Sequence, residues 1–185
     1  MSLIAEFEDS RLLKFIYRNM GFFLDNPVRR WFNDPVKKID AAGIRAGMEV
    51  LEVGCGSGYF TVPAARLVGD EGRLHAIDIH PVAVETVSER VNESGLGNVV
   101  VSKTDALETG LPSGSYDLIL LFGVIPTPVL PLNRLLPEMH RLLRPGGSMA
   151  VWTGLPLWSP KSVTKGGLFT YVGERNGVHG FTRNG

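Results

Sequence analysis

The sequence predicts an α/β domain in which helices cover both faces of a mainly parallel sheet that ends in an antiparallel hairpin. Between residues 41 and 153, apolar β-branched runs alternate with segments of helical spacing, the pattern of a parallel sheet with crossover helices. Asn176-Gly177 lies between two strand-like runs near the end of the chain and predicts a tight hairpin turn. Five parallel strands and two hairpin strands together predict a sheet of seven strands.

The expected strands follow the apolar runs of the chain. The third and fourth contain Val99-Val100-Val101 and Leu118-Ile119-Leu120-Leu121, continuous runs typical of strands that are buried on both faces. A turn is expected over Arg144-Pro145-Gly146-Gly147, just before the fifth strand. The seven strands are expected over residues 49–53, 73–78, 98–103, 116–122, 148–153, 168–172 and 178–182.

The long helices alternate with the parallel strands. Pro137 lies inside the last of them and predicts a kink or a later start, because proline lacks the N–H that an interior helical residue donates. Two short helices are expected earlier, over residues 12–20 and 29–36, the second with Asn26 as N-cap and Pro27 in its first turn. The long helices are expected over residues 59–68, 81–92 and 129–143.

Composition and charge limit the class of protein. The chain has 185 residues, 44% of them hydrophobic, which suits one domain with a sizeable core. Its 19 basic and 19 acidic residues give zero formal net charge, which argues against a broad nucleic-acid-binding surface. Cys55 is the single cysteine, so no disulfide and no cysteine-built metal site is expected. Without a signal-peptide pattern or a run of roughly 18 apolar residues, a cytoplasmic protein is expected.

Three glycines at alternate positions, Gly54, Gly56 and Gly58, directly follow the first expected strand and precede a helix. Glycine lets the backbone turn sharply and lets a ligand lie close to it, and the helix N-terminus adds free N–H groups. The dinucleotide fingerprint G-x-G-x-x-G expects its third glycine where this chain has Tyr59. Glu52, two residues before Gly54, would repel a pyrophosphate and attract a ligand that carries an ammonium group.

The pattern Glu52-x-Gly54-x-Gly56-x-Gly58 resembles the first motif of the class I S-adenosylmethionine-dependent methyltransferases. Residues 135–147, Leu-Leu-Pro-Glu-Met-His-Arg-Leu-Leu-Arg-Pro-Gly-Gly, are similar to the helix and turn before the fifth strand in the small-molecule branch, including methyltransferases of quinone biosynthesis. The resemblance implies a Rossmann-like three-layer sandwich with a seven-stranded, mainly parallel sheet. It also implies S-adenosyl-L-methionine as the cofactor and methyl transfer as the reaction.

Two aspartates are expected to bind the nucleoside part of that cofactor. Asp78 ends the second strand, twenty residues after Gly58, where a carboxylate can accept hydrogen bonds from both ribose hydroxyls. The alternative is that Asp78 caps the next helix. Asp105 follows the third strand, and the resemblance implies that it meets the adenine amine while the Ala106 backbone lies at the ring edge. The alternative there is a turn-forming aspartate.

The resemblance extends to the remaining cofactor contacts. It implies that Glu52 and the glycine loop hold the methionine part, and that the end of the fourth strand borders the methyl group and the acceptor. The run Phe122-Gly123-Val124 departs from the Asn-Pro-Pro-Tyr of adenine- and glutamine-methylating enzymes, which argues against those branches. The expected cofactor-binding residues are therefore Glu52, Gly54, Cys55, Gly56, Gly58, Asp78, Ile79, Asp105, Ala106, Phe122 and Gly123.

No residue is singled out as catalytic, because the sulfonium already activates the methyl group and no enzyme nucleophile is needed. His80, His140, His179 and Tyr17 are weak candidates for a general base, since a lone histidine is usually a packed or surface residue. Cys55 is expected to be a small apolar residue rather than a nucleophile. No metal site is expected.

The resemblance also suggests that residues 1–40 form a helical lid over the cofactor, with residues 41–185 as the methyltransferase domain. A plain packing or dimer-forming helix is the alternative. Leu155, Leu157 and Trp158 favour a small apolar or aromatic acceptor, and a monomer or homodimer without a nucleic-acid partner is expected. Two other functions stay open: a cofactor-binding protein or partner subunit without transferase activity, and a nicotinamide-dependent oxidoreductase.

Overall fold

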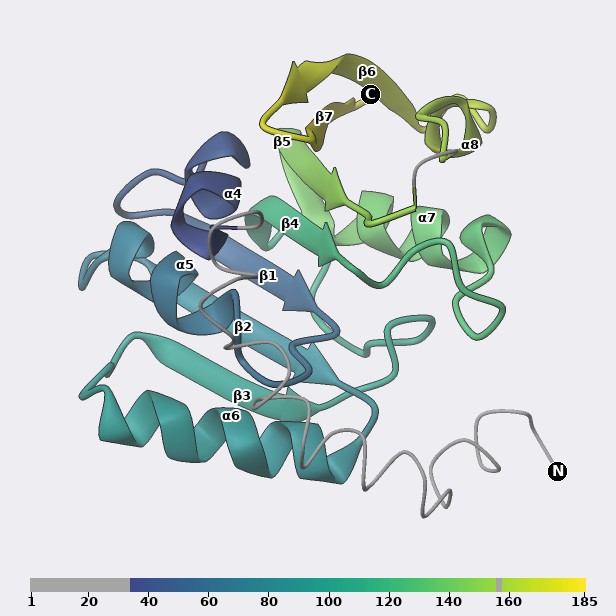
Figure 1. Cartoon of the computed structure of the whole chain (residues 1–185). Helices are drawn as coiled ribbons and strands as arrows, with labels where there is room; N and C mark the ends of the chain where they lie inside the picture. The colour runs from purple at the N-terminus through teal and green to yellow at the C-terminus, as the bar shows by residue number, and fades with distance from the viewer. Residues whose placement is uncertain (1–33, 156–157) are drawn as a thin grey trace, which may run out of the picture.

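The computed structural model describes residues 34–155 and 158–185, which form a three-layer α/β sandwich (Figure 1). Its strands are β1 (Glu49–Val53), β2 (Arg73–Asp78), β3 (Val99–Lys103), β4 (Tyr116–Phe122), β5 (Leu143–Trp152), β6 (Phe169–Arg175) and β7 (Val178–Arg183). They form one seven-stranded sheet in the order β3-β2-β1-β4-β5-β7-β6. The first five strands are mutually parallel, and β7 is antiparallel to both β5 and β6. The predicted fold class is confirmed.

The described helices are α4 (Pro35–Ala41), α5 (Thr61–Val68), α6 (Pro81–Glu93), α7 (Leu132–Leu142) and α8 (Lys161–Thr164). α4, α5 and α6 cover one face of the sheet, and α7 and α8 cover the other (Figure 1). Alternate residues of the buried strands pack against opposite layers of helices. Val50 packs on the α5 side, whereas its neighbour Leu51 packs on the α7 side. None of the described helices is long and apolar enough to span a membrane.

Several boundaries differ from those expected. α7 begins at Leu132, three residues later than predicted, and Pro137 lies inside it. β5 begins at Leu143, because Tyr116 pairs with Leu143 and Leu118 pairs with Ser148. Residues 144–147 therefore form a bulge in which Gly146 has a φ of +77°. The chain turns where predicted, but the turn lies inside β5 and not before it.

Helix α4 packs against the sheet and against the hairpin. It begins after Asp34, whose Oδ1 accepts from the Val36 N–H at 2.9 Å, and Ile39 is completely buried. Lys38 Nζ donates to the Asn176 carbonyl at 2.6 Å and lies 5.3 Å from the centre of the Trp152 ring. The helix predicted over residues 12–20 lies outside the described residues, as does most of the one over 29–36. The boundary after residue 40 stays a prediction.

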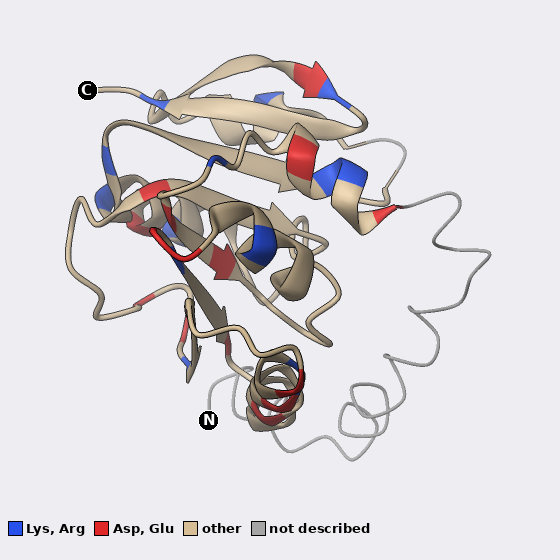
Figure 2. Cartoon of the chain, turned by 90° about the vertical axis from the view of Figure 1, so that its left-hand side faces the viewer, with Lys and Arg blue, Asp and Glu red and all other residues tan. Residues whose placement is uncertain are grey.

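Figure 2 shows positions of both charges on one side of the molecule. Both signs occur in α4 and in the hairpin, whereas acidic positions predominate along α6. The chain as a whole has zero formal net charge.

Candidate active site

The glycine loop crosses from the end of β1 over the end of β2. The N–H groups of Gly54 and Cys55 both donate to the Ile77 carbonyl, at 2.8 and 3.1 Å. Gly54 has a φ of +74°, a left-handed conformation that residues with a Cβ rarely adopt. A strand, a sharp turn and the N-terminus of α5 thus follow one another as the sequence predicts.

Asp78, at the carboxyl end of β2, links the glycine loop to the start of helix α6 through hydrogen bonds. Its Oδ2 accepts from the Gly56 N–H at 3.0 Å, and its Oδ1 accepts from the His80 N–H at 2.9 Å. The N-cap of α6 is His80, whose Nδ1 accepts from the Val82 N–H. Burial raises the pKa of Asp78, against the hydrogen bonds from His80 and Gly56. Because a carboxylate has about four lone-pair sites, Asp78 retains capacity for further donors.

Glu52, two residues before Gly54, is a buried residue whose side chain bonds to helix α5. Its carboxylate is 2% exposed and accepts from the Thr61 hydroxyl at 2.6 Å, which links the end of β1 to the first residue of α5. Burial raises the pKa of Glu52 to about 8; the hydrogen bond from Thr61 opposes this rise and the charge of Asp78 adds to it. A contact between Glu52 and a ligand ammonium group stays a prediction.

Cys55 is also buried, at 5% exposure. Burial raises the pKa of its thiol, and the charges of Glu52 and Asp78 raise it further. The thiolate that a cysteine nucleophile requires is therefore disfavoured, in line with the expectation that Cys55 is a packed residue.

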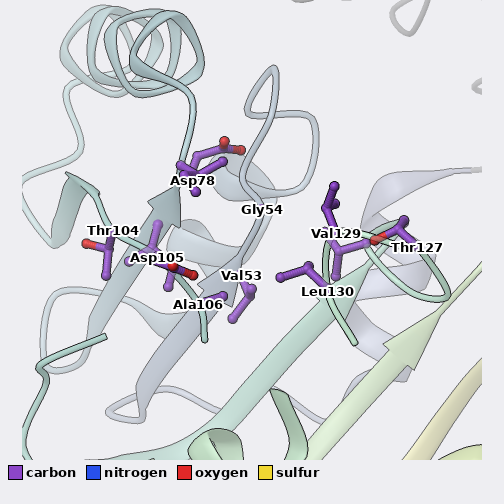
Figure 3. Close-up of a pocket in the computed structure, with 13 residues that line it drawn as sticks. Val53, Gly54, Asp78, Thr104, Asp105, Ala106, Thr127, Val129 and Leu130 are labelled. Atoms are coloured by element: carbon purple, nitrogen blue, oxygen red, sulfur yellow. The ribbon is translucent and has the colours of Figure 1, made fainter. Parts of the chain in front are cut away.

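A cavity opens at the carboxyl ends of β1, β2, β3 and β4. Figure 3 shows Asp78, Thr104, Asp105 and Ala106 on one side of it, and Thr127, Val129 and Leu130 on the other. The complete lining is Val53, Gly54, Ile77, Asp78, Ile79, Thr104, Asp105, Ala106, Gly123, Val124, Thr127, Val129 and Leu130. Six of the expected cofactor-binding residues belong to it: Gly54, Asp78, Ile79, Asp105, Ala106 and Gly123.

The other five expected residues, Glu52, Cys55, Gly56, Gly58 and Phe122, do not line this cavity. Phe122 packs on the α5 side of the sheet, where its ring meets Phe60 edge to face at 5.0 Å. The next residue, Gly123, follows the strand with a φ of +74° and lines the cavity.

Only one of the two carboxylate oxygens of Asp105 accepts a hydrogen bond from the described residues. Its Oδ1 accepts from the Leu107 N–H at 2.8 Å, which closes the turn that the alternative interpretation predicted. None of the described residues donates to Oδ2 in the structure. The turn and the ligand contact are therefore compatible, since each uses a different oxygen.

The sequence interpretation missed the apolar wall formed by Val129 and Leu130. Both residues were assigned to the helix expected over 129–143, and the later start of α7 places them in the loop that follows β4. Thr127 lies in the same loop, and its hydroxyl has no hydrogen-bond partner among the described residues. Pro131, the residue before α7, is a signal for the later start.

The weak candidates for a general base lie elsewhere. His140 bonds through Nε2 to the Asn184 carbonyl at 2.8 Å, and the His179 ring centre lies 5.0 Å from that of Trp158, with the rings tilted by 57°. His80 caps α6, and Tyr17 lies outside the described residues. None of these three histidines lines the cavity.

The fold and the cavity define the class of protein: an α/β domain with its ligand site at the carboxyl ends of parallel strands, beside a glycine loop. The chain belongs to the methyltransferase domain family, whose model matches residues 50–147. The resemblance predicted from the glycine-loop motif is confirmed.

Individual relatives agree with this assignment. The chain is 38% identical to the aklanonic acid methyltransferase DauC of Streptomyces sp. (strain C5), over 56% of this chain and 44% of the relative. It is 32% identical to the ubiquinone/menaquinone biosynthesis C-methyltransferase UbiE of Psychromonas ingrahamii, over 67% and 50%. A crystal structure of a SAM-dependent methyltransferase from Aquifex aeolicus superposes with a TM-score of 0.71, at 25% identity, over 89% of this chain and 96% of that one. The chain spans about half the length of these curated relatives.

Proposed function

We propose that the protein transfers a methyl group from S-adenosyl-L-methionine to a small apolar or aromatic acceptor. The observation that carries the proposal is the cavity in which Asp78 and Asp105 lie beside the glycine loop, in a chain of the methyltransferase domain family. Family membership favours this function over a nicotinamide-dependent oxidoreductase, as do the missing third glycine and Glu52. Cytoplasmic location and a monomeric or homodimeric state stay predictions.

The donors and acceptors in the cavity fit the nucleoside part of the cofactor. Asp78 would accept from the ribose hydroxyls with its remaining lone pairs. Asp105 Oδ2 would accept from the adenine amine, and the Ala106 backbone would lie at the ring edge. Val53, Ile77 and Leu130 would pack against the adenine ring and keep water away from it.

The glycine loop and the end of β4 would orient the reacting end of the cofactor. When bound, the cofactor supplies a methyl group that its sulfonium has already activated. The protein then has to hold acceptor and methyl group in line at near-attack distance, which can contribute roughly 7–11 kcal/mol to lowering the barrier. A base is required only for an acceptor that must lose a proton.

The apolar wall of the cavity supports a small, uncharged acceptor. Val124, Val129 and Leu130 contribute this wall, and Gly123 leaves space beside it. Two of the relatives act, by their names, on aklanonic acid and in ubiquinone and menaquinone biosynthesis. Others are named as a nocamycin O-methyltransferase and a protein-L-isoaspartate O-methyltransferase. An aromatic or quinone-like acceptor is therefore the first class to test.

Calorimetric titration tests the cofactor site directly. We expect the wild-type protein to bind S-adenosylmethionine and S-adenosylhomocysteine but not NAD, and Asp78→Ala to lose this binding. Asp70→Ala is the matched control, because Asp70 is an exposed aspartate outside the cavity. Absence of adenosyl binding by folded wild-type protein would overturn the proposal. Transfer of labelled methyl to a naphthoquinol then distinguishes an enzyme from a cofactor-binding protein.

A further inference from the structure

Val124 stands against the first glycine of the loop. A Cβ built on Gly54 would collide with Val124 Cγ1, so the valine side chain occupies the space directly over the Gly54 backbone. Both residues line the cavity. The contact joins the residue after β1 to the loop after β4.

The residues expected at the two parts of the cofactor differ in their surroundings. Asp78, Asp105 and Ala106, expected at the nucleoside part, line the cavity. Gly54, expected at the methionine part, lies directly against the Val124 side chain. A ligand group laid on the Gly54 backbone would therefore meet Val124 first.

We infer that the Val124 side chain, seated over the Gly54 backbone, discriminates between ligands with and without an amino-acid part. This inference rests on the proposed function. An adenosine derivative without the amino-acid part would occupy the cavity and leave Val124 in place. S-adenosylmethionine and S-adenosylhomocysteine must also displace the Val124 side chain from Gly54, which reduces their affinity by the cost of that displacement.

The local packing explains why the displacement has a cost. Val124 also packs against the apolar core on the α7 side of the sheet, and the next residue, Ile125, is 2% exposed. A valine side chain has few alternative rotamers, so a buried neighbour leaves it little freedom to turn aside. Moving it requires a shift of the loop after β4.

The test compares two ligands and two sizes of side chain by calorimetry. The probes are 5′-methylthioadenosine, which lacks the amino-acid part, and S-adenosylhomocysteine, which has it. We expect Val124→Ala to tighten binding of S-adenosylhomocysteine roughly tenfold and to leave methylthioadenosine within about twofold. Val124→Leu should weaken S-adenosylhomocysteine only.

Val129→Ala is the matched control, because it removes the same atoms from the same loop and the same cavity without touching Gly54. It should change the affinity for both ligands by a similar factor. If wild type binds both ligands but Val124→Ala changes them equally, or leaves S-adenosylhomocysteine unchanged, the inference is overturned and the proposed function stands. If wild type binds neither ligand, both fail.

Discussion

Glu52 is a buried carboxyl group whose ionisation is coupled to folding. The pKa of Glu52 is about 8 in the folded protein, against 4.5 for the free side chain, because the carboxyl is removed from water. Between these values the folded state binds more protons than the unfolded state, so the free energy of unfolding decreases as pH rises. Burial raises the pKa of Asp78 too, and this acts in the same direction.

Replacing Glu52 with glutamine should therefore flatten this pH dependence. Glutamine keeps an oxygen that can accept from the Thr61 hydroxyl but cannot ionise. We expect Glu52→Gln to lose less stability than wild type between about pH 5 and pH 8. Urea denaturation at the two pH values measures this, and equal slopes in the two proteins would contradict the assignment. The pH dependence of the free energy of unfolding that remains in Glu52→Gln is attributed to Asp78, whose pKa burial also raises.

Two separate features disfavour a side chain at Gly54: its left-handed backbone and the nearby Val124 side chain. Gly54→Ala should lower the free energy of unfolding by about 2–5 kcal/mol, because the residue is left-handed and its Cβ meets Val124. Gly114→Ala is the control: its φ is +64° but nothing lies within 4 Å of a Cβ there, so a loss of about 1–2 kcal/mol is expected. Adding Val124→Ala to Gly54→Ala should recover part of the difference.

At the scale of elements, α7 holds the loop that connects β3 to β4. Glu138 accepts from the Thr109 N–H at 3.0 Å and the Thr109 hydroxyl at 2.6 Å, and forms an ion pair with Arg141. Arg141 in turn donates to the Leu111 carbonyl at 2.8 Å. These contacts fix the segment that follows Asp105 and so support one wall of the cavity.

Glu138→Gln should destabilise the protein at neutral pH by about 1–2 kcal/mol, the size of a hydrogen bond to a charged group. The hydrogen bond from Arg141 is the main cause that lowers the pKa of Glu138 to about 2. Its stabilisation is present above the unfolded pKa of 4.5 and is lost as pH falls towards 2. The variant should therefore lose less stability than wild type on acidification. Acid titrations followed by circular dichroism would contradict this if both proteins showed the same pH dependence.

A second pair of elements, α4 and the β6–β7 hairpin, meets through Lys38. Lys38→Ala removes the hydrogen bond to the Asn176 carbonyl and the cation–π contact with Trp152, and should reduce stability by about 1 kcal/mol. Lys37→Ala, an exposed neighbour on the same helix, should change it by less than about 0.5 kcal/mol. Equal effects in thermal denaturation would show that the contact is not stabilising.

At the scale of the whole molecule, the cavity exists only in the folded chain. Its lining comes from the ends of β1 and β2 and from the segments after β3 and β4, which are brought together by the strand order β3-β2-β1-β4. S-adenosylhomocysteine at about a hundred times its Kd should therefore raise the free energy of unfolding by about 2.7 kcal/mol. Asp78→Ala should abolish the increase while Asp70→Ala retains it, as measured by ligand-dependent thermal shifts.

The sheet and part of the site could be predicted because their signals are local. β1, β2 and β4 have the predicted limits, and the continuous apolar run of β4 is buried as expected. The similar run in β3 is not buried on both faces: β3 is an edge strand, and Val100 is 45% exposed. Burial depends on the neighbouring elements as well as on the segment. Asp78 and Asp105 were predicted because parallel strands present their carboxyl ends at one edge. Val129 and Leu130 were missed, because a helix start depends on how the preceding loop packs.

The sequence by itself determined the fold class, the glycine loop and the positions of the two aspartates, since each depends on neighbours in the chain. The tertiary structure decided which side chains reach the cavity: Glu52 and Phe122 are buried and do not line it. It also decided that Val124 covers Gly54, because these residues belong to segments about 70 positions apart that only the pairing of β1 with β4 brings together. Long-range packing has no signature in a local pattern, and the shape of the site depends on it.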